Sequence, residues 1–220
     1  MRDEPGQVEH ADSEPVLAAA ARIASIPGLG LEQRRRRLLR YLGPTLGAAQ
    51  LEHIVVHCEH VGRTAARLAH LMRLPPLQVE RTRLAGLLHD LGKIRVPEAV
   101  LGKPGPLSTH ERAGLDRHAA DGAQLCRVLG APAEIADAVL QHHRHADGSD
   151  DPSLPPPPLG ARILRVADAL AVMTAGRAYS SARTFTEALA ELRRGKGRAF
   201  DEGAVVAAHI LGASIMSLAA

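Results

Sequence analysis

The feature that most restricts the fold is the near absence of strand-forming patterns. No stretch sustains the alternation of apolar and polar residues that a half-buried β-strand requires. The chain has no tryptophan, and aromatic residues make up only 2% of its 220 positions. Apolar residues instead recur at spacings of three and four, which is typical of the buried face of a helix. The sequence therefore predicts an all-α fold.

Composition indicates a globular domain in a reducing compartment. Hydrophobic residues make up 45% and charged residues 23%, as in ordinary folded domains. A chain of this length buries roughly 70% of the surface that it exposes when unfolded, so no metal or disulfide is needed merely to stabilise it. Cys58 and Cys126 lie far apart in helical sequence, which argues against a secreted disulfide scaffold. We expect a cytoplasmic protein.

Charge and hydropathy argue against duplex nucleic acid and membrane partners. The net charge is only +3. Residues 1–14 are acidic and lack the basic start and apolar core of a signal peptide. The long apolar run 204–220 contains His209 and falls short of the ~20 residues that a membrane span needs. We expect this run to form a buried C-terminal helix.

Helical spacing, Pro/Gly breaks and capping boxes divide the chain into segments. The Ser108/Glu111 and Thr184/Glu187 pairs are capping boxes that start helices. The expected helices are 15–26, 31–42, 51–74, 77–91, 108–129, 132–145, 159–174, 184–194 and 201–220. Segment 92–107 is expected to be irregular, and 147–158, with four consecutive prolines, a loop. We predict a disordered tail over 1–14, a helical extension over 15–50, and the main domain over 51–220.

The arginine-rich run in the second expected helix has two readings. It contains Arg34 to Arg37 and Arg40. A solvated helix face is favoured over a nucleotide or partner site, because charge runs on helices usually face water.

Histidines are numerous and fall at particular places in the expected helices. His53, His57 and His60 follow the i, i+4, i+7 pattern of one helix face. Four further histidines and two aspartates lie at or near the ends of expected helices or midway along them: His89, His118, His142, His143, Asp90 and Asp168. Imidazoles with carboxylates suit divalent manganese, iron or zinc. Adjacent residues on a helix diverge by about 100°, so a histidine pair can serve two neighbouring ions.

Asp168 lies in an apolar run, where an unpartnered carboxylate would cost several kcal/mol. A cation or an arginine could compensate it. A pair of ions joined by a bridging carboxylate would activate water for attack on phosphorus.

The combined pattern resembles the HD-GYP family, a branch of the HD-domain metal-dependent phosphohydrolases. The stretch Leu87–Val96, which contains His89-Asp90, resembles the family's HD block, and the segments around His118, His142-His143 and Asp168 resemble its later blocks. The resemblance covers residues 51–200 and implies an HD-domain helical bundle that hydrolyses cyclic di-GMP with iron or manganese.

The resemblance also implies residue roles. It assigns one ion to His57, His89, Asp90 and Asp168, and a second ion to His118, His142 and His143, with Asp90 bridging. Lys93 would lie beside the phosphate, where it stabilises charge or protonates the leaving oxygen. Arg177 and Tyr179 are candidate contacts to phosphate or guanine, with plain packing as the alternative. His53 stands where some members bind a third ion, and a helix-surface histidine is the alternative.

The sequence departs from the family in its signature loop. The family reads Asp-Gly-Ser-Gly-Tyr-Pro where this chain has Asp147-Gly148-Ser149-Asp150-Asp151-Pro152. Arg144 replaces a glutamate, and Ala146 replaces an aromatic residue that could stack on guanine. The two added carboxylates are predicted to repel an anionic substrate.

Three functions remain open at this point. The first is a phosphodiesterase acting on a cyclic dinucleotide, most simply cyclic di-GMP. The second is an HD-type phosphohydrolase for another nucleotide or phosphoester, which the altered loop favours. The third is a non-catalytic module that binds a cyclic dinucleotide or a protein. A protein partner or a second copy of the chain also remains open.

Overall fold

The computed structural model describes residues 13–175 and 182–218, and these ranges confirm the all-α prediction. Within them there is no strand, and one isolated bridge joins Lys196 to Phe200. The longer helices are α1 (Ser13–Ala24), α2 (Leu31–Leu42), α4 (Cys58–Leu71), α5 (Pro76–Leu88), α7 (Thr109–Asp116), α8 (His118–Val128), α9 (Ala133–Gln141), α10 (Leu159–Ala175), α11 (Phe185–Arg194) and α12 (Glu202–Leu218). Short elements are the 3₁₀ turns η1 (Gly43–Thr45) and η3 (Leu91–Arg95), the π-helical η2 (Glu52–His57), α3 (Ala48–Leu51) and α6 (Glu98–Leu101).

The predicted capping boxes start the helices as expected. The backbone N–H of Glu111 donates to Ser108 Oγ, and the backbone N–H of Ser108 donates to the Glu111 carboxylate. The Thr184/Glu187 pair does the same for α11. These reciprocal bonds satisfy N–H groups that the first turn of a helix leaves without partners.

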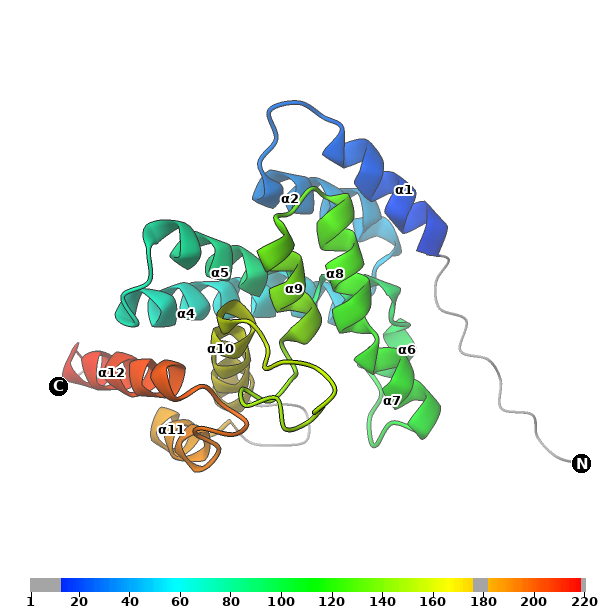
Figure 1. The fold of residues 1–220 in the computed structure, drawn as a ribbon. Helices are drawn as coiled ribbons and strands as arrows, with labels where there is room; N and C mark the ends of the chain where they lie inside the picture. Colours follow the sequence, from blue (N-terminus) through cyan, green and yellow to red (C-terminus); the bar gives the residue numbers. More distant parts are fainter. Residues whose placement is uncertain (1–12, 176–181, 219–220) are drawn as a thin grey trace, which may run out of the picture.

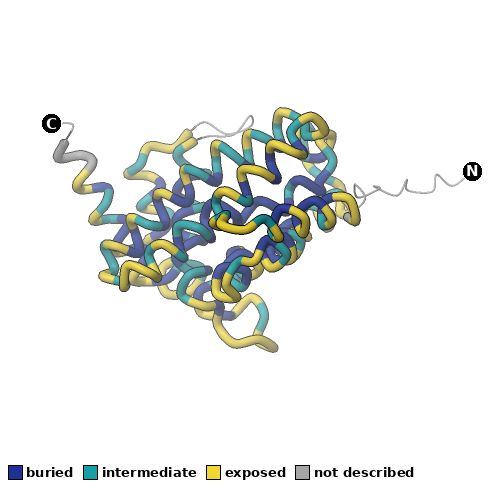
Figure 2. The backbone as a smooth tube through the Cα atoms, turned by 90° about the horizontal axis from the view of Figure 1, so that it is seen from above, coloured by how far each residue is buried: buried dark blue, intermediate teal, exposed yellow. Residues whose placement is uncertain are grey.

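The core forms where α4, α5, α9 and α10 pack together. Helices α4 and α5 lie antiparallel, α9 contacts α5, α8 and α10, and α10 also contacts α4 (Figure 1). Each of these helices contributes buried residues to the core, and Figure 2 draws the buried stretches of the chain in dark blue. Leu68, Leu88 and Leu164 are among the fully buried side chains. This packing brings the C-terminal end of α5 next to the N-terminal part of α4 and the middle of α10.

Several expected elements differ in detail from the structure. The helix expected over 132–145 ends at Gln141, so His142 and His143 lie beyond it. The single helix expected over 51–74 includes a π-helical turn before α4. The helix expected over 108–129 breaks at Arg117 into α7 and α8. The segment 92–107, expected to be irregular, contains η3 and α6. The periodicity of apolar residues along the sequence does not reveal contacts between distant segments, such as the packing of η3 on α8.

The first and last described helices pack on the same body. Residues 1–12, most of the predicted acidic tail, lie outside the described residues, and α1 begins at Ser13. Helix α1 packs on α2 and α8, and α12 packs on α4 (Figure 1). The inner face of α12 is buried as expected, whereas Val206 and Ile210 are exposed. No helix in the described ranges is long and apolar enough to cross a bilayer.

Candidate metal centre

Three of the predicted ligands lie just past the last turn of a helix. His89 directly follows α5, His142 directly follows α9, and His118 is the first residue of α8, separated from α7 only by Arg117. The Nδ1 of each ring lies 2.6–2.9 Å from the carbonyl three residues earlier, at Gly86, Leu115 and Val139 respectively. Carbonyls in the last turn of a helix lack intrahelical donors, so the imidazole N–H donates to them. Each ring is thereby fixed with Nε2 unprotonated and aimed away from its own helix.

The first ligand group consists of His57, His89 and Asp168, and is referred to below as the His57 group. Its ligand atoms all lie within 4.8 Å of one another. His57 Nε2 is 3.0 Å from Asp168 Oδ1, and His89 Nε2 is 3.8 Å from the same oxygen. These residues come from η2, the end of α5, and α10, so the tertiary packing alone brings them together.

The second ligand group consists of His118, His142 and His143, and is referred to below as the His118 group. Its nitrogens also lie within 4.8 Å of one another. The Nε2 atoms of His118 and His143 are 3.1 Å apart. His118 and His142 are buried, whereas much of His143 is exposed. This group therefore reaches the surface at His143.

Asp90 lies between the two groups. Its Oδ1 is 3.3 Å from His118 Nε2, and its Oδ2 is 3.4 Å from His89 Nε2 and 3.7 Å from His57 Nε2. One oxygen thus faces each group, which is the disposition of a bridging carboxylate. The side chains of all seven predicted ligands converge on one region.

The donor set fits divalent cations. His89 and His142 are each 1% exposed, and their Nε2 atoms are buried without a hydrogen-bond partner. Buried polar atoms in proteins are normally hydrogen-bonded, so two such nitrogens call for a ligand. Five imidazoles and two carboxylates are ligands that iron, manganese and zinc accept.

Electrostatics favour the protonation states that metal ligands need. Burial lowers the pKa of all three imidazoles of the His118 group. The pKa of His142 falls well below its usual value, and the pKa of His143 falls to about 4. Neighbouring imidazoles lower each pKa further. Burial alone would raise the pKa of Asp90, but electrostatic interactions with His89, Lys93 and His118, together with the hydrogen bond from Lys93, outweigh burial and keep the pKa well below its usual range. Neutral imidazoles and ionised carboxylates are the forms that bind metal.

Lys93 is positioned at the same centre. Its Nζ donates to Asp90 Oδ2 over 2.7 Å, and the side chain is largely buried. Lys93 lies on η3, three residues after Asp90, so the tight 3₁₀ turn returns its side chain over the carboxylate.

Comparison with known proteins identifies the family. A family model for the HD domain matches residues 31–203. The chain belongs to the HD domain family. It is 36% identical over 151 residues to the cyclic di-GMP phosphodiesterase response regulator RpfG of Xanthomonas campestris, covering 65% of this chain and 39% of that protein.

A further relative carries a phosphodiesterase name, and one solved structure shares the fold. It is 31% identical over 161 residues to the 3'3'-cGAMP-specific phosphodiesterase 2 of Vibrio cholerae, covering 70% of this chain and 29% of the relative. The HDG"Y"P protein Bd1817 of Bdellovibrio bacteriovorus has the same fold, with a TM-score of 0.59 at 16% identity over 96% of this chain and 74% of that one. The chain spans about a third of the length of the two phosphodiesterases.

The altered HD-GYP loop has its own internal bonding. Arg144 donates to the carbonyls of Asp151 and Pro155, and its Nε lies 3.7 Å from Asp150 Oδ2. Asp150 Oδ1 accepts from the backbone N–H of His145. The arginine that replaces the family's glutamate therefore partly neutralises Asp150. The carboxylate of Asp151 accepts hydrogen bonds from Ser153.

Several predicted residues lie outside the centre or outside the described ranges. Arg177 and Tyr179 fall within residues 176–181, which the structure does not describe. His60 is exposed. The ring of His53 is 6.1 Å from that of His57, edge-on, beside the His57 group rather than within it.

The interpretation of the arginine run as a solvated face is wrong for two of its members. Arg35 is 2% exposed, and its guanidinium donates to the Ile54 carbonyl; Arg34 donates to the Leu129 carbonyl over 2.8 Å. Arg36, Arg37 and Arg40 are exposed as predicted. The signal was present, because Arg35 is in register with the apolar stripe of α2 that contains Leu31, Leu38 and Leu42.

Arg165 is another residue that the sequence did not single out. Its guanidinium donates to the His143 carbonyl and lies 5.5 Å from the centre of the Phe200 ring. Burial lowers the pKa of Arg165, and the nearby carboxylates of Asp150 and Asp168 oppose this shift. Arg165 precedes Asp168 by three residues on α10, so the two side chains share one face of that helix.

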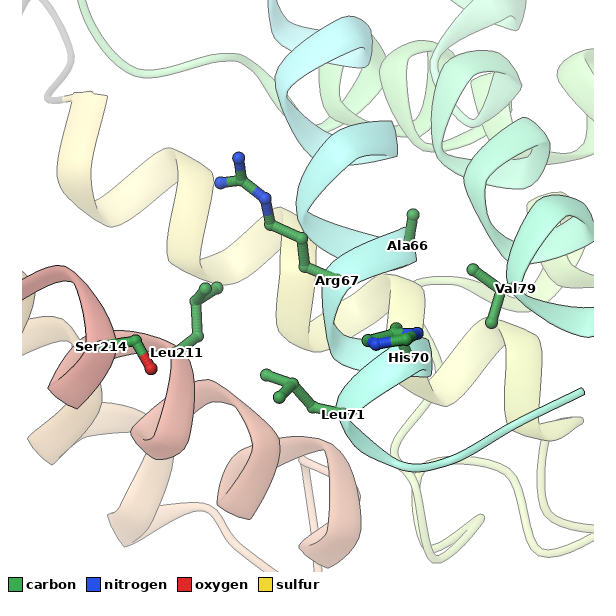
Figure 3. Close-up of a pocket in the computed structure, with 7 residues that line it drawn as sticks. All are labelled: Ala66, Arg67, His70, Leu71, Val79, Leu211 and Ser214. Atoms are coloured by element: carbon green, nitrogen blue, oxygen red, sulfur yellow. The ribbon is translucent and has the colours of Figure 1, made fainter. Parts of the chain in front are cut away.

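A separate groove lies away from the centre, between α4, α5 and α12. Its volume is about 420 Å³. Figure 3 shows Leu71 and Leu211 facing one another across it. It is lined by Ala66, Arg67, His70, Leu71, Val79, Leu211 and Ser214. None of the seven converging ligands lines it, and its walls carry no carboxylate.

Proposed function

We propose that this chain is a metal-dependent phosphodiesterase that hydrolyses a cyclic dinucleotide, with cyclic di-GMP as the first candidate. The observation that carries the proposal is the carboxylate of Asp90, which turns one oxygen to each of two ligand groups. An arrangement of this kind suits two-ion chemistry on phosphodiesters. The names of the relatives support the same class of substrate.

The proposed cofactors are two divalent ions, iron or manganese. The His57 group with Asp90 would hold one, and the His118 group with Asp90 the other. Ions bound there would supply Lewis-acid activation of the attacking water and charge stabilisation at the phosphorus. The unpartnered buried Nε2 atoms of His89 and His142 support this assignment.

Lys93 is proposed as the catalytic cation of the protein itself. Its ammonium group, held 2.7 Å from Asp90, can stabilise negative charge on the phosphoryl oxygens or give a proton to the leaving 3′-oxygen. We expect Lys93→Met to lower kcat roughly 10²- to 10⁴-fold while the metal content stays unchanged. Arg177 and Tyr179, outside the described residues, are proposed as substrate contacts.

A second candidate is a phosphodiesterase for another cyclic dinucleotide or phosphoester. The altered loop favours it, because Asp150 and Ala146 stand where the family carries a glycine and an aromatic residue. Relatives named for 3'3'-cGAMP are about as similar to this chain as some of those named for cyclic di-GMP. The pairing of Asp150 with Arg144 weakens the expected repulsion of an anionic substrate.

The test combines metal analysis with a turnover assay. Protein purified without oxygen is analysed for metal, then incubated with cyclic di-GMP, 3'3'-cGAMP and an aryl phosphodiester. About two ions per chain and hydrolysis of cyclic di-GMP are expected. Asp90→Asn should lose both, because it weakens the shared ligand. The control is Asp137→Asn, which alters only an exposed pair with Arg127 and should leave both unchanged.

The outcomes separate the alternatives. Turnover of 3'3'-cGAMP or the aryl ester alone would establish the second candidate. Two bound ions and tight cyclic di-GMP binding without turnover would indicate a binding module. Metal-free protein after loading with iron or manganese would refute the proposal.

A further inference from the structure

The π-helical turn η2 ends at His57, a predicted ligand. It spans Glu52–His57 and is the π-helical element among residues 13–175 and 182–218. A π turn adds one residue to a helical turn, is costly relative to an α turn, and occurs frequently at functional sites. Something in the structure must therefore stabilise it here.

Buried residues flank and enter the π turn. Gln50, Ile54 and Cys58 are buried and follow one another at intervals of four, so one side of the chain faces the core before, within and after the turn. The extra residue of the π turn sets the direction in which His57 leaves this buried side.

Two side chains satisfy carbonyls within the π turn. The guanidinium of Arg35, from α2, donates to the Ile54 carbonyl. The Cys58 thiol donates to the His53 carbonyl over 3.2 Å. A widened turn exposes carbonyls that a regular i+4 ladder would use, and a buried carbonyl without a donor is costly.

The burial of Arg35 is itself unusual. The residue is 2% exposed, and its Nε is buried without a hydrogen-bond partner. A guanidinium is seldom buried on a leucine-rich helix face unless its bonds compensate for lost hydration. Here the bond is to a backbone carbonyl three residues before His57. Glu32 and Glu59 interact with Arg35 electrostatically but accept no hydrogen bond from it among the described contacts.

We propose that Arg35 is a positioning residue of the metal centre, holding the π turn that directs His57 toward Asp168 and Asp90. The proposal rests on the proposed metal-binding function. Without the guanidinium, the π turn would relax toward α-helical geometry. An α-helical turn holds one residue fewer, so His57 would rotate by about 100° relative to the preceding segment. Its Nε2 would then leave the position 3.0 Å from Asp168.

The experiment compares Arg35→Met with a matched control in the same helix. The control is Leu38→Ala, which removes a fully buried side chain of α2 and leaves the guanidinium of Arg35 in place. Each protein is loaded with cobalt(II), and affinity is measured by chelator competition while the visible absorption reports the coordination. Arg35→Met should bind one of two ions 10- to 100-fold more weakly, as expected for a support of a ligand. Leu38→Ala should lose comparable thermal stability but keep both affinities.

A double-mutant cycle tests whether Arg35 acts through His57. In a His57→Ala background, Arg35→Met should cause no further loss of cobalt affinity, because the ligand that it positions is absent. Arg35→Lys, which retains a charged donor, should recover part of the affinity. If Arg35→Met does not fold, Arg35→Gln is measured in its place and should show the same loss.

The possible results distinguish the two proposals. Wild-type protein that binds no cobalt, iron or manganese would refute the proposed function itself. Wild-type protein that binds two ions, with Arg35 variants equal to wild type in affinity and spectrum, would overturn the positioning role alone. An equal loss in the Arg35 and Leu38 variants would also overturn it, because it would show general destabilisation.

Discussion

Gly92 offers a sharp test of how the helix packing sets the metal centre. It lies on η3, two residues after Asp90, and η3 packs directly on α8. A Cβ added at Gly92 would lie 2.0 Å from the backbone oxygen of His118 and 2.6 Å from the backbone nitrogen of Gly122. Both are backbone atoms, so no side-chain rotation can relieve the overlap.

The size of the perturbation follows from these distances. Ordinary van der Waals contact begins near 3.4 Å, so Gly92→Ala must move α8 away from η3 by more than 1 Å. Overpacking of this kind costs about 1–3 kcal/mol or more. For a chain of this size, that corresponds to a fall in Tm of roughly 2 to 12 °C. The same movement would separate His118 Nε2 from Asp90 Oδ1, now 3.3 Å apart.

The assay measures stability and metal affinity in parallel. Thermal unfolding of metal-free Gly92→Ala should show the lower Tm, and chelator competition should show weaker binding by the His118 group, about 10- to 100-fold. Gly43→Ala is the control, because its φ is −48° and a Cβ there meets nothing within 4 Å. An alanine at Gly92 with wild-type Tm and metal affinity would refute the packing argument.

Three further predictions follow from the same contacts. The Lys103 ammonium and the Ser108 backbone lower the pKa of the Glu111 carboxyl to about 2. Its pKa in the unfolded chain is near 4.5. The stabilisation that the ionised carboxylate contributes is therefore complete above pH 4.5 and is lost as the pH falls toward 2. Glu111→Gln should therefore make the free energy of unfolding, measured with a chemical denaturant, depend less steeply on pH between about 2 and 4.5. The same pH dependence in the variant and the wild type would contradict this prediction. Arg165→Met should weaken metal binding by the His118 group about 10-fold, measured by chelator competition, because the His143 carbonyl loses its donor; unchanged affinity would show that His143 needs no such support. Removal of metal with a strong chelator should lower the free energy of unfolding by about 2.7 kcal/mol, compared with protein in which the free ion concentration is 100 times the Kd. Thermal unfolding measures the difference, and an identical Tm with and without metal would argue against a bound ion.

The fold was largely predictable because its signals are local. Apolar spacing of three and four identified the main helices, and the capping boxes at Ser108 and Thr184 located two helix starts. Glycines and prolines located the ends, as at Gly130, which has a φ of +78° after α8. The break at Arg117 was missed, because apolar periodicity continues across it.

The candidate site was predictable only as a set of residue types. The histidines and aspartates drew attention by their number and placement, and the family resemblance grouped them. Nothing in their spacing shows that Asp90 turns one oxygen to each ligand group, since that depends on how α8 packs against η3. The bond from Arg35 to the Ile54 carbonyl joins residues 19 apart, so local pattern could not reveal it.

The amino-acid sequence by itself determined that the chain is helical, where most helices begin and end, and which side chains could bind metal. These properties depend on neighbours within about one helical turn. The tertiary structure alone decided which of the histidines converge, that Arg35 of a charged run is buried, and that Arg144 faces Asp150 in the altered loop. Those outcomes depend on side chains from different helices meeting in space, where close packing and the cost of unpaired buried groups select one arrangement.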